Sequence, residues 1–204
     1  DQGVTVCDTA IGLIYTDDVD LIGDHAPMLD EIKAAIHKEW GVRDVDSDFV
    51  LGVKRELKDD PITGERTIEL TMTAFIDNLY KEFTEYMNVA TVNTPFPEKM
   101  FISKDRDGIP ESVAKSFIDK GYQRLVGSLL WACRNVFAEC TLGVSFLCRR
   151  MAHPDLDAWN GAIHMLQWLH QERERGIMFR STGNYEPVAY SDASNVIDPA
   201  DRLV

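Results

Sequence analysis

Two adjacent carboxylates, Asp17 and Asp18, are the side chains in this sequence with the clearest potential for chemistry. They lie between two short apolar runs at 11–15 and 19–23, and this pattern predicts a β-hairpin with the pair at its tip. With a third carboxylate from a neighbouring strand, the pair would offer the hard oxygen ligands that Mg²⁺ prefers. Two such ions activate an attacking hydroxyl and stabilise a departing pyrophosphate. Adjacent aspartates are also common in turns, so the pair alone leaves both interpretations open.

The elements around the pair alternate between short strands and amphipathic helices. A helix is expected from Pro27 to Gly41, followed by a second hairpin over 49–57 and 67–72 and a helix over 73–87. The prolines and mixed charges of 88–115 favour a loop or linker. The remaining periodic segments predict three helices, at 117–133, 138–151 and 155–175. Two strands that begin another sheet are then expected at 177–179 and 188–192.

The composition is that of a globular protein with an uneven charge. Hydrophobic residues make up 45% of the 204 residues, which suffices for a core, and the formal net charge is −13. Residues 1–60 hold fifteen acidic and six basic residues, whereas residues 121–180 hold five acidic and seven basic. The acidic part suits divalent cations and the arginine-bearing part suits a polyanion, although a solvated acidic surface explains the same numbers.

The cysteines and the apolar segments bear on the cellular location of the protein, and the two ends of the sequence bear on its extent. The four cysteines, Cys7, Cys133, Cys140 and Cys148, form no metal-binding or disulfide pattern, and we expect reduced thiols in the core of an intracellular protein. No stretch reaches the roughly 20 apolar residues of a membrane helix. The chain starts at Asp1 rather than Met and its last predicted strand ends close to residue 204, so we expect a piece cut from a longer protein.

An ordered series of motifs resembles the polymerase of copia-type retrotransposons. The sequence Ile-Tyr-Thr-Asp-Asp-Val-Asp-Leu-Ile-Gly at 14–23 is similar to the Tyr-Val-Asp-Asp motif of their reverse transcriptases, and Phe-Val-Leu-Gly-Val at 49–53 to their primer-grip strand. Segments similar to the thumb, the connection and the start of ribonuclease H follow in the family's order, at 75–95, 122–131, 149–162 and 190–202. Each motif is weak alone, but the ordered series covers nearly the whole chain.

The resemblance implies an α+β fold with partial polymerase palm hairpins, a helical thumb and connection, and the first strands of a truncated ribonuclease H-like sheet. It divides the chain into four parts. The end of the palm with the primer grip spans 1–57, the thumb with its linker 58–115, the helical connection 116–183 and the start of ribonuclease H 184–204. It implies an RNA-directed DNA polymerase that takes an RNA or DNA template–primer and deoxynucleotides. The family works in a cytoplasmic particle or the nucleus, and no membrane partner is implied; the sequence does not indicate the oligomeric state.

The resemblance also assigns roles to individual residues. Asp17 and Asp18 would be catalytic ligands of two Mg²⁺ ions, with Tyr15 and Thr16 as supporting motif positions, and Asp192 would be the first metal ligand of ribonuclease H. The primer-grip role maps to Phe49, Leu51 and Gly52. Gly52 would let the backbone approach the primer closely, although ordinary strand packing explains these three residues equally well.

Several positions depart from the family pattern. Thr16 replaces the usual Val, Cys-Arg-Asn-Val at 133–136 replaces Thr-Arg-Pro-Asp, and Ser194-Asn195 replaces an Asp-Trp pair. The third polymerase carboxylate is expected before residue 1 and the other ribonuclease H acids after residue 204, so this piece alone is expected to be inactive. Two alternatives remain: a decayed or domesticated remnant that binds nucleic acid or protein, and an unrelated acidic interaction domain.

Overall fold

The computed structural model describes residues 10–15, 18–23, 25–44, 48–60, 62–88, 90–97 and 108–180, together with residue 189. Strands β1 (Ala10–Tyr15) and β2 (Asp18–Gly23) form a two-stranded antiparallel sheet, which confirms the first predicted hairpin. Helix α1 (Ala26–Trp40) packs against β2 and ends at Gly41, as the sequence predicts. Its half-buried apolar residues recur at helical spacing, at Met28, Leu29, Ile32 and Ile36.

The second predicted hairpin is present, but the strand expected over 49–57 is divided in two. Strand β3 (Phe49–Val50) turns directly into β4 (Val53–Asp59), which pairs with β5 (Arg66–Thr71). The break falls at Leu51 and Gly52, whose φ angles are 53° and 83°. Two successive positive φ angles define the tight two-residue turn of a β-hairpin, and apolar periodicity carries no signal of it.

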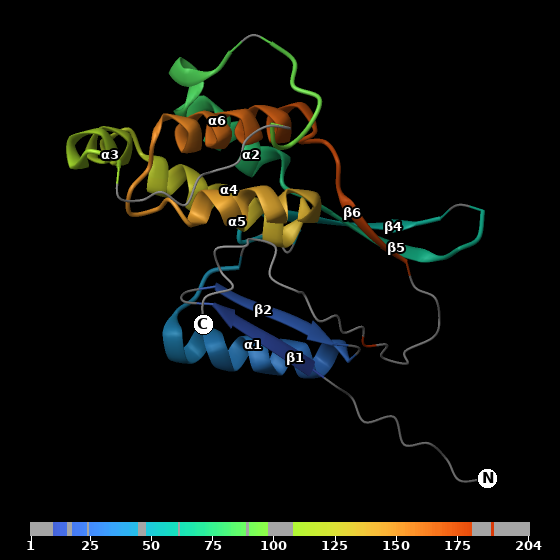
Figure 1. The fold of residues 1–204 in the computed structure, drawn as a ribbon. Helices are drawn as coiled ribbons and strands as arrows, with labels where there is room; N and C mark the ends of the chain where they lie inside the picture. Colours follow the sequence, from blue (N-terminus) through green and yellow to red (C-terminus); the bar gives the residue numbers. More distant parts are fainter. Residues whose placement is uncertain are drawn as a thin grey trace.

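A fourth strand corrects the expectation for the end of the chain. The sequence predicts that 177–179 begins another sheet; in the structure β6 (Ile177–Arg180) pairs antiparallel with β5 and so joins the sheet of the second hairpin, while 188–192 lies outside the described residues apart from residue 189. The sheet order is therefore β3-β4-β5-β6, and its far end projects away from the helices (Figure 1). A Cβ at Gly176 would lie 2.7 Å from the backbone oxygen of Leu70, so the absence of a side chain permits this close pairing.

The helices are shorter than the periodic segments predict. The segment expected at 73–87 gives α2 (Thr73–Glu82) and a 3₁₀ turn, η1 (Thr84–Tyr86). The helix expected over 117–133 becomes α3 (Glu111–Asp119) and α4 (Tyr122–Asn135), because Gly121 between them takes a left-handed conformation with φ 93°. The start of α3 at Glu111 also corrects the loop expected over 88–115. The last two segments give η2 (Ala138–Cys140), α5 (Thr141–Cys148) and α6 (Leu156–Gln171).

The hydrophobic core lies among the helices, with α4 packed against α2, α3, α5 and α6. Cys133 and Cys140 are buried free thiols within it, as expected from the sequence. A hydrogen bond with Cys133, reinforced by burial, raises the pKa of the Cys140 thiol. Val53 and Met72 belong to the same core and so attach the sheet to the helical body.

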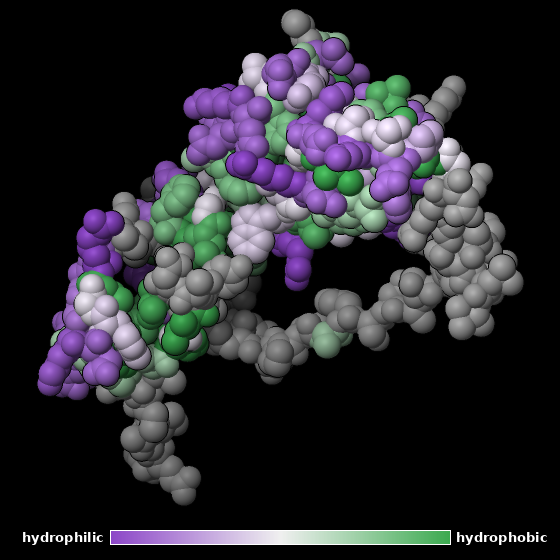
Figure 2. All heavy atoms as spheres, turned by 90° about the vertical axis from the view of Figure 1, so that its left-hand side faces the viewer, coloured by the Kyte–Doolittle hydropathy of each residue, from purple (hydrophilic) through white to green (hydrophobic). Residues whose placement is uncertain are grey.

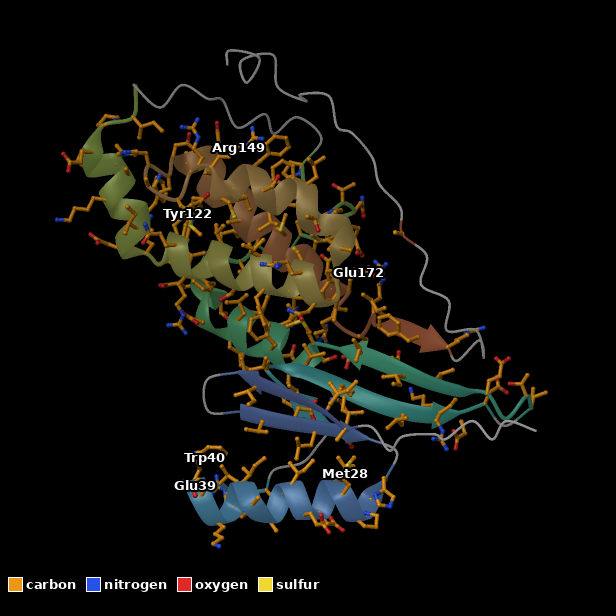
Figure 3. All side chains as sticks on the ribbon, turned by 90° about the horizontal axis from the view of Figure 1, so that it is seen from below. Met28, Glu39, Trp40, Tyr122, Arg149 and Glu172 are labelled. Carbon is orange, nitrogen blue, oxygen red and sulfur yellow. The ribbon has the colours of Figure 1, made fainter. Side chains whose placement is uncertain are left out.

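Tyr122 anchors the start of α4 inside this body (Figure 3). Its side chain is fully buried, and its hydroxyl donates a hydrogen bond of 2.9 Å to the backbone oxygen of Leu147 at the end of α5. Burial raises the pKa of the Tyr122 hydroxyl, so it remains a donor throughout the neutral range.

We predict that Tyr122→Phe lowers the free energy of unfolding by about 1 kcal/mol, because a buried hydrogen bond is lost while the ring is kept. Urea unfolding of the chain measures this difference. Ser145→Ala is the matched control, since its exposed hydroxyl also donates to a backbone oxygen, that of Leu142, at 2.7 Å. A loss no larger than that of Ser145→Ala would contradict the role assigned to Tyr122.

Candidate functional site

The predicted Asp-Asp hairpin is built from an antiparallel ribbon of six paired positions. Tyr15, the last residue of β1, is the register partner of Asp18, the first residue of β2. The pairing therefore brings the motif positions 15 and 18 together at one end of the ribbon. Thr16 and Asp17, as well as Asp192, lie outside the described residues.

Asp20, two residues after Asp18 in β2, links this hairpin to the four-stranded sheet. Its two carboxylate oxygens accept hydrogen bonds of 2.6 and 3.2 Å from the two terminal nitrogens of Arg55 in β4. The side chains are only 17% and 26% exposed, so the ion pair is partly shielded from water. Because the planar guanidinium binds both oxygens, it fixes the orientation of the carboxylate as well as its distance. A single point charge would fix only the distance.

The sequence does not predict this contact. Asp20 belongs to the hairpin motif, but nothing in a single sequence signals an ion pair between residues 35 positions apart. The backbone around Arg55 is also held, because its N–H donates to the oxygen of Asp48 at 2.6 Å.

The three predicted primer-grip residues lie together at the β3–β4 hairpin. Phe49 is 46% exposed and pairs with Lys54, while Leu51 and Gly52 form the turn itself. Leucine rarely adopts a positive φ, because its Cβ then crowds the following carbonyl at a cost of about 1–2 kcal/mol. Such a conformation persists only where neighbouring groups hold it.

Two residues that the sequence did not single out for this site contact the turn. The indole N–H of Trp131 in α4 donates a hydrogen bond of 3.2 Å to the backbone oxygen of Leu51. On the other side, a Cβ added to Gly52 would approach the ring of Phe75 in α2 to 3.2 Å. The turn is thus held between α2 and α4, and glycine is the residue that fits position 52.

An open cavity of about 460 Å³ lies beside the turn. Leu51 and Phe75 form one wall, and the residues Arg124, Gly127, Ser128 and Trp131 on one face of α4 form the other. Its lining is mainly apolar, and the small residues Gly127 and Ser128 leave room between the larger side chains. Arg124 is oriented by an ion pair of 2.8 Å with Glu82.

Within the part of the chain that the structure describes, no cluster of three or more histidine, cysteine or acidic residues is placed to hold a metal ion. The expected metal ligands Asp17 and Asp192 are not in that part. Among the described residues, no helix combines the length and apolarity needed to cross a membrane.

One curated protein is similar to this chain along most of its length. It is the "Retrovirus-related Pol polyprotein from transposon TNT 1-94" of Nicotiana tabacum, with 22% identity over 195 residues. The match covers 93% of this chain and 14% of the polyprotein. No family model and no solved structure matches. The chain is therefore similar to part of a retrotransposon Pol polyprotein, and it spans about one seventh of that relative.

We predict that Asp20→Asn lowers the free energy of unfolding by about 1–2 kcal/mol, because the amide cannot form the charged two-oxygen contact with Arg55. Hydrogen exchange should also become faster in β1 and β2 than in α4. Asp59→Asn is the control, because the Asp59–Arg66 pair is 3.5 Å apart with both side chains more than 70% exposed. Equal effects of the two variants on exchange in β1 and β2 would refute the link.

We also predict that Gly52→Ala destabilises the chain more than Gly64→Ala. Both glycines have a positive φ, of 83° and 69°, but a Cβ at Gly64 meets nothing within 4 Å. Gly64→Ala should therefore cost about 1 kcal/mol from backbone conformation alone. Gly52→Ala should cost about 1 kcal/mol more, from the displaced Phe75 ring. Urea unfolding measures both, and identical losses would show that Phe75 does not constrain the turn.

Proposed function

We propose that this chain is part of the RNA-directed DNA polymerase of a copia-type retrotransposon, comprising the end of the palm, the thumb, the connection and the start of ribonuclease H. The observation that carries the proposal is the similarity to a retrotransposon Pol polyprotein along 93% of the chain. The antiparallel pairing of Tyr15 with Asp18 supports it, because the motif then stands at the end of a true hairpin.

The residues of the hairpin suit Mg²⁺. Asp17 and Asp18 offer only carboxylate oxygens, the ligand type that this ion prefers, and they would hold two ions together with a third carboxylate from elsewhere in the protein. When bound, such ions supply Lewis-acid activation of the primer 3′ hydroxyl and neutralise the charge of the departing pyrophosphate. Asp192 would hold a metal ion in the ribonuclease H site.

The chain's other residues would place the primer relative to this hairpin. The β3–β4 turn lies beside the open cavity that Leu51 lines, and a primer strand would approach the turn from this cavity. Arg55 follows this turn in β4 and binds Asp20, so this ion pair connects the strand after the turn to the β1–β2 hairpin. Such rigid placement is what a reaction between two bound substrates requires, because misplacement by about 1 Å costs up to about 100-fold in rate.

Exposed apolar residues support the proposal that the chain acts within a larger protein. Ile11, Ile14 and Ile22 in the β1–β2 ribbon are exposed by 65%, 74% and 56%. In the space-filling view, apolar side chains gather in the lower part of the molecule, where α1 and this ribbon lie (Figure 2). Clustered exposed apolar surface of this kind normally packs against further polypeptide, here the remainder of the Pol protein.

Asp17→Asn in the longer Pol protein that contains this chain is predicted to reduce Mg²⁺-dependent primer extension by a factor of about 1,000 or more, because an amide is a poor ligand for a hard cation. Extension of a DNA primer on an RNA template measures it. The control is Asp30→Asn, an exposed acidic residue on α1, which should leave the rate within about twofold.

Full extension by Asp17→Asn would refute the metal-ligand assignment. A wild-type protein that binds template–primer with Asp17 and Asp18 intact, but never extends it, would instead favour the second candidate function, a binding module derived from a decayed polymerase.

A further inference from the structure

We infer that Trp131 is a positioning residue: its indole N–H holds the strained Leu51–Gly52 turn in place and, through that turn, any primer strand that the turn guides. The role in primer placement rests on the proposed function. The role in holding the turn rests on geometry alone.

The turn needs a contact of this kind because its own hairpin is too short to fix it. Strand β3 contributes only two residues, and the register pair Val50 and Val53 closes the turn directly. Leu51 has a φ of 53°, a backbone conformation that is unfavourable for a residue with a Cβ. Among the described strands β3 is the edge strand of the four-stranded sheet, and two paired residues give it little stability of its own.

Trp131 is well placed to supply the missing constraint. It projects from α4, a helix whose other face is anchored in the core by fully buried residues such as Leu125, Val126 and Leu129. Its backbone oxygen accepts a hydrogen bond of 2.8 Å from the Asn135 side chain, which secures the last turn of the helix. The indole therefore moves with a rigid body, and its bond of 3.2 Å to Leu51 transmits that rigidity to the turn.

The contact between Trp131 and the turn lies at the wall of the open cavity. Trp131 and Leu51 both line it, so the bond that joins them also forms part of its wall. Phe75 backs Gly52 by packing alone, without a directional bond. Trp131 is thus the contact to the turn that fixes orientation as well as distance.

The experiment compares Trp131→Phe, which keeps an aromatic ring but removes the N–H, with Trp168→Phe. Trp168 is the matched control because it is a buried indole on α6, packed edge-on against Phe137. In the 204-residue chain, amide exchange over 49–54 should become about fivefold faster in Trp131→Phe, as expected for one lost hydrogen bond. It should stay within about twofold in Trp168→Phe once global stability is matched with urea.

The second measurement uses the longer Pol protein and an RNA template with a DNA primer. Trp131→Phe should lower kcat for extension by about tenfold or more while the Kd for template–primer stays within about twofold, because phosphate contacts dominate binding and orientation dominates the rate. A variant that merely loosens the fold should alter both, and Trp168→Phe serves to measure that effect.

The outcomes separate the two proposals. Unchanged exchange over 49–54 in Trp131→Phe, or an equal change in Trp168→Phe, overturns the role of Trp131. Faster exchange with an unaltered kcat overturns its role in primer placement. If the wild-type protein extends no primer at all, the proposed polymerase function fails, and the exchange result alone then supports or overturns Trp131 as the holder of the turn.

Discussion

The ion pair between Arg55 and Asp20 is the interaction on which the proposed site depends. It joins a two-stranded ribbon, which carries the expected metal ligands, to a sheet whose β3–β4 turn carries the expected primer contact. Both partners are partly shielded, and the two-oxygen geometry restricts rotation as well as separation. Because α1 has no fully buried residue among those described, the ribbon and its helix gain little rigidity from a core of their own. The Arg55–Asp20 pair therefore contributes more to the placement of the ribbon than an exposed surface ion pair normally contributes to a fold.

The helical body also restrains the β3–β4 turn. The hydrogen bond from Tyr122 to the backbone oxygen of Leu147 joins α4 to α5, and the indole of Trp131 on α4 binds the backbone oxygen of Leu51 in the strained turn. One departure from the copia-type pattern lies at the end of this helix. The segment at 133–136 lacks the proline that would stop it, yet α4 ends at Asn135, where the Asn135 side chain binds the oxygen of Trp131 and Val136 leaves helical geometry. The helix therefore ends at Asn135 without a proline.

How much of this could be predicted from the sequence depends on the range of each interaction. The β1–β2 hairpin, α1 with its end at Gly41, and the second hairpin follow from local periodicity and turn residues. The turn at Leu51 and Gly52 does not, because leucine favours strands and its positive φ is imposed by contacts from distant helices. The pairing of β6 with β5 joins residues more than a hundred positions apart, and the Trp131–Leu51 bond spans 80. A single sequence carries no signal for such contacts. The metal-binding roles of Asp17, Asp18 and Asp192 stay predictions, as do the polymerase and ribonuclease H assignments.

The most direct test of the proposed polymerase site is a structure of the longer Pol protein bound to an RNA template, a DNA primer, Mg²⁺ and a non-reactive nucleotide. We predict metal ions at the carboxylates of Asp17 and Asp18, and the primer backbone against the turn at Leu51 and Gly52. We further predict that the Arg55–Asp20 pair stays intact between them. A primer bound on another face of the protein, with no metal ion at the hairpin, would contradict the proposed site.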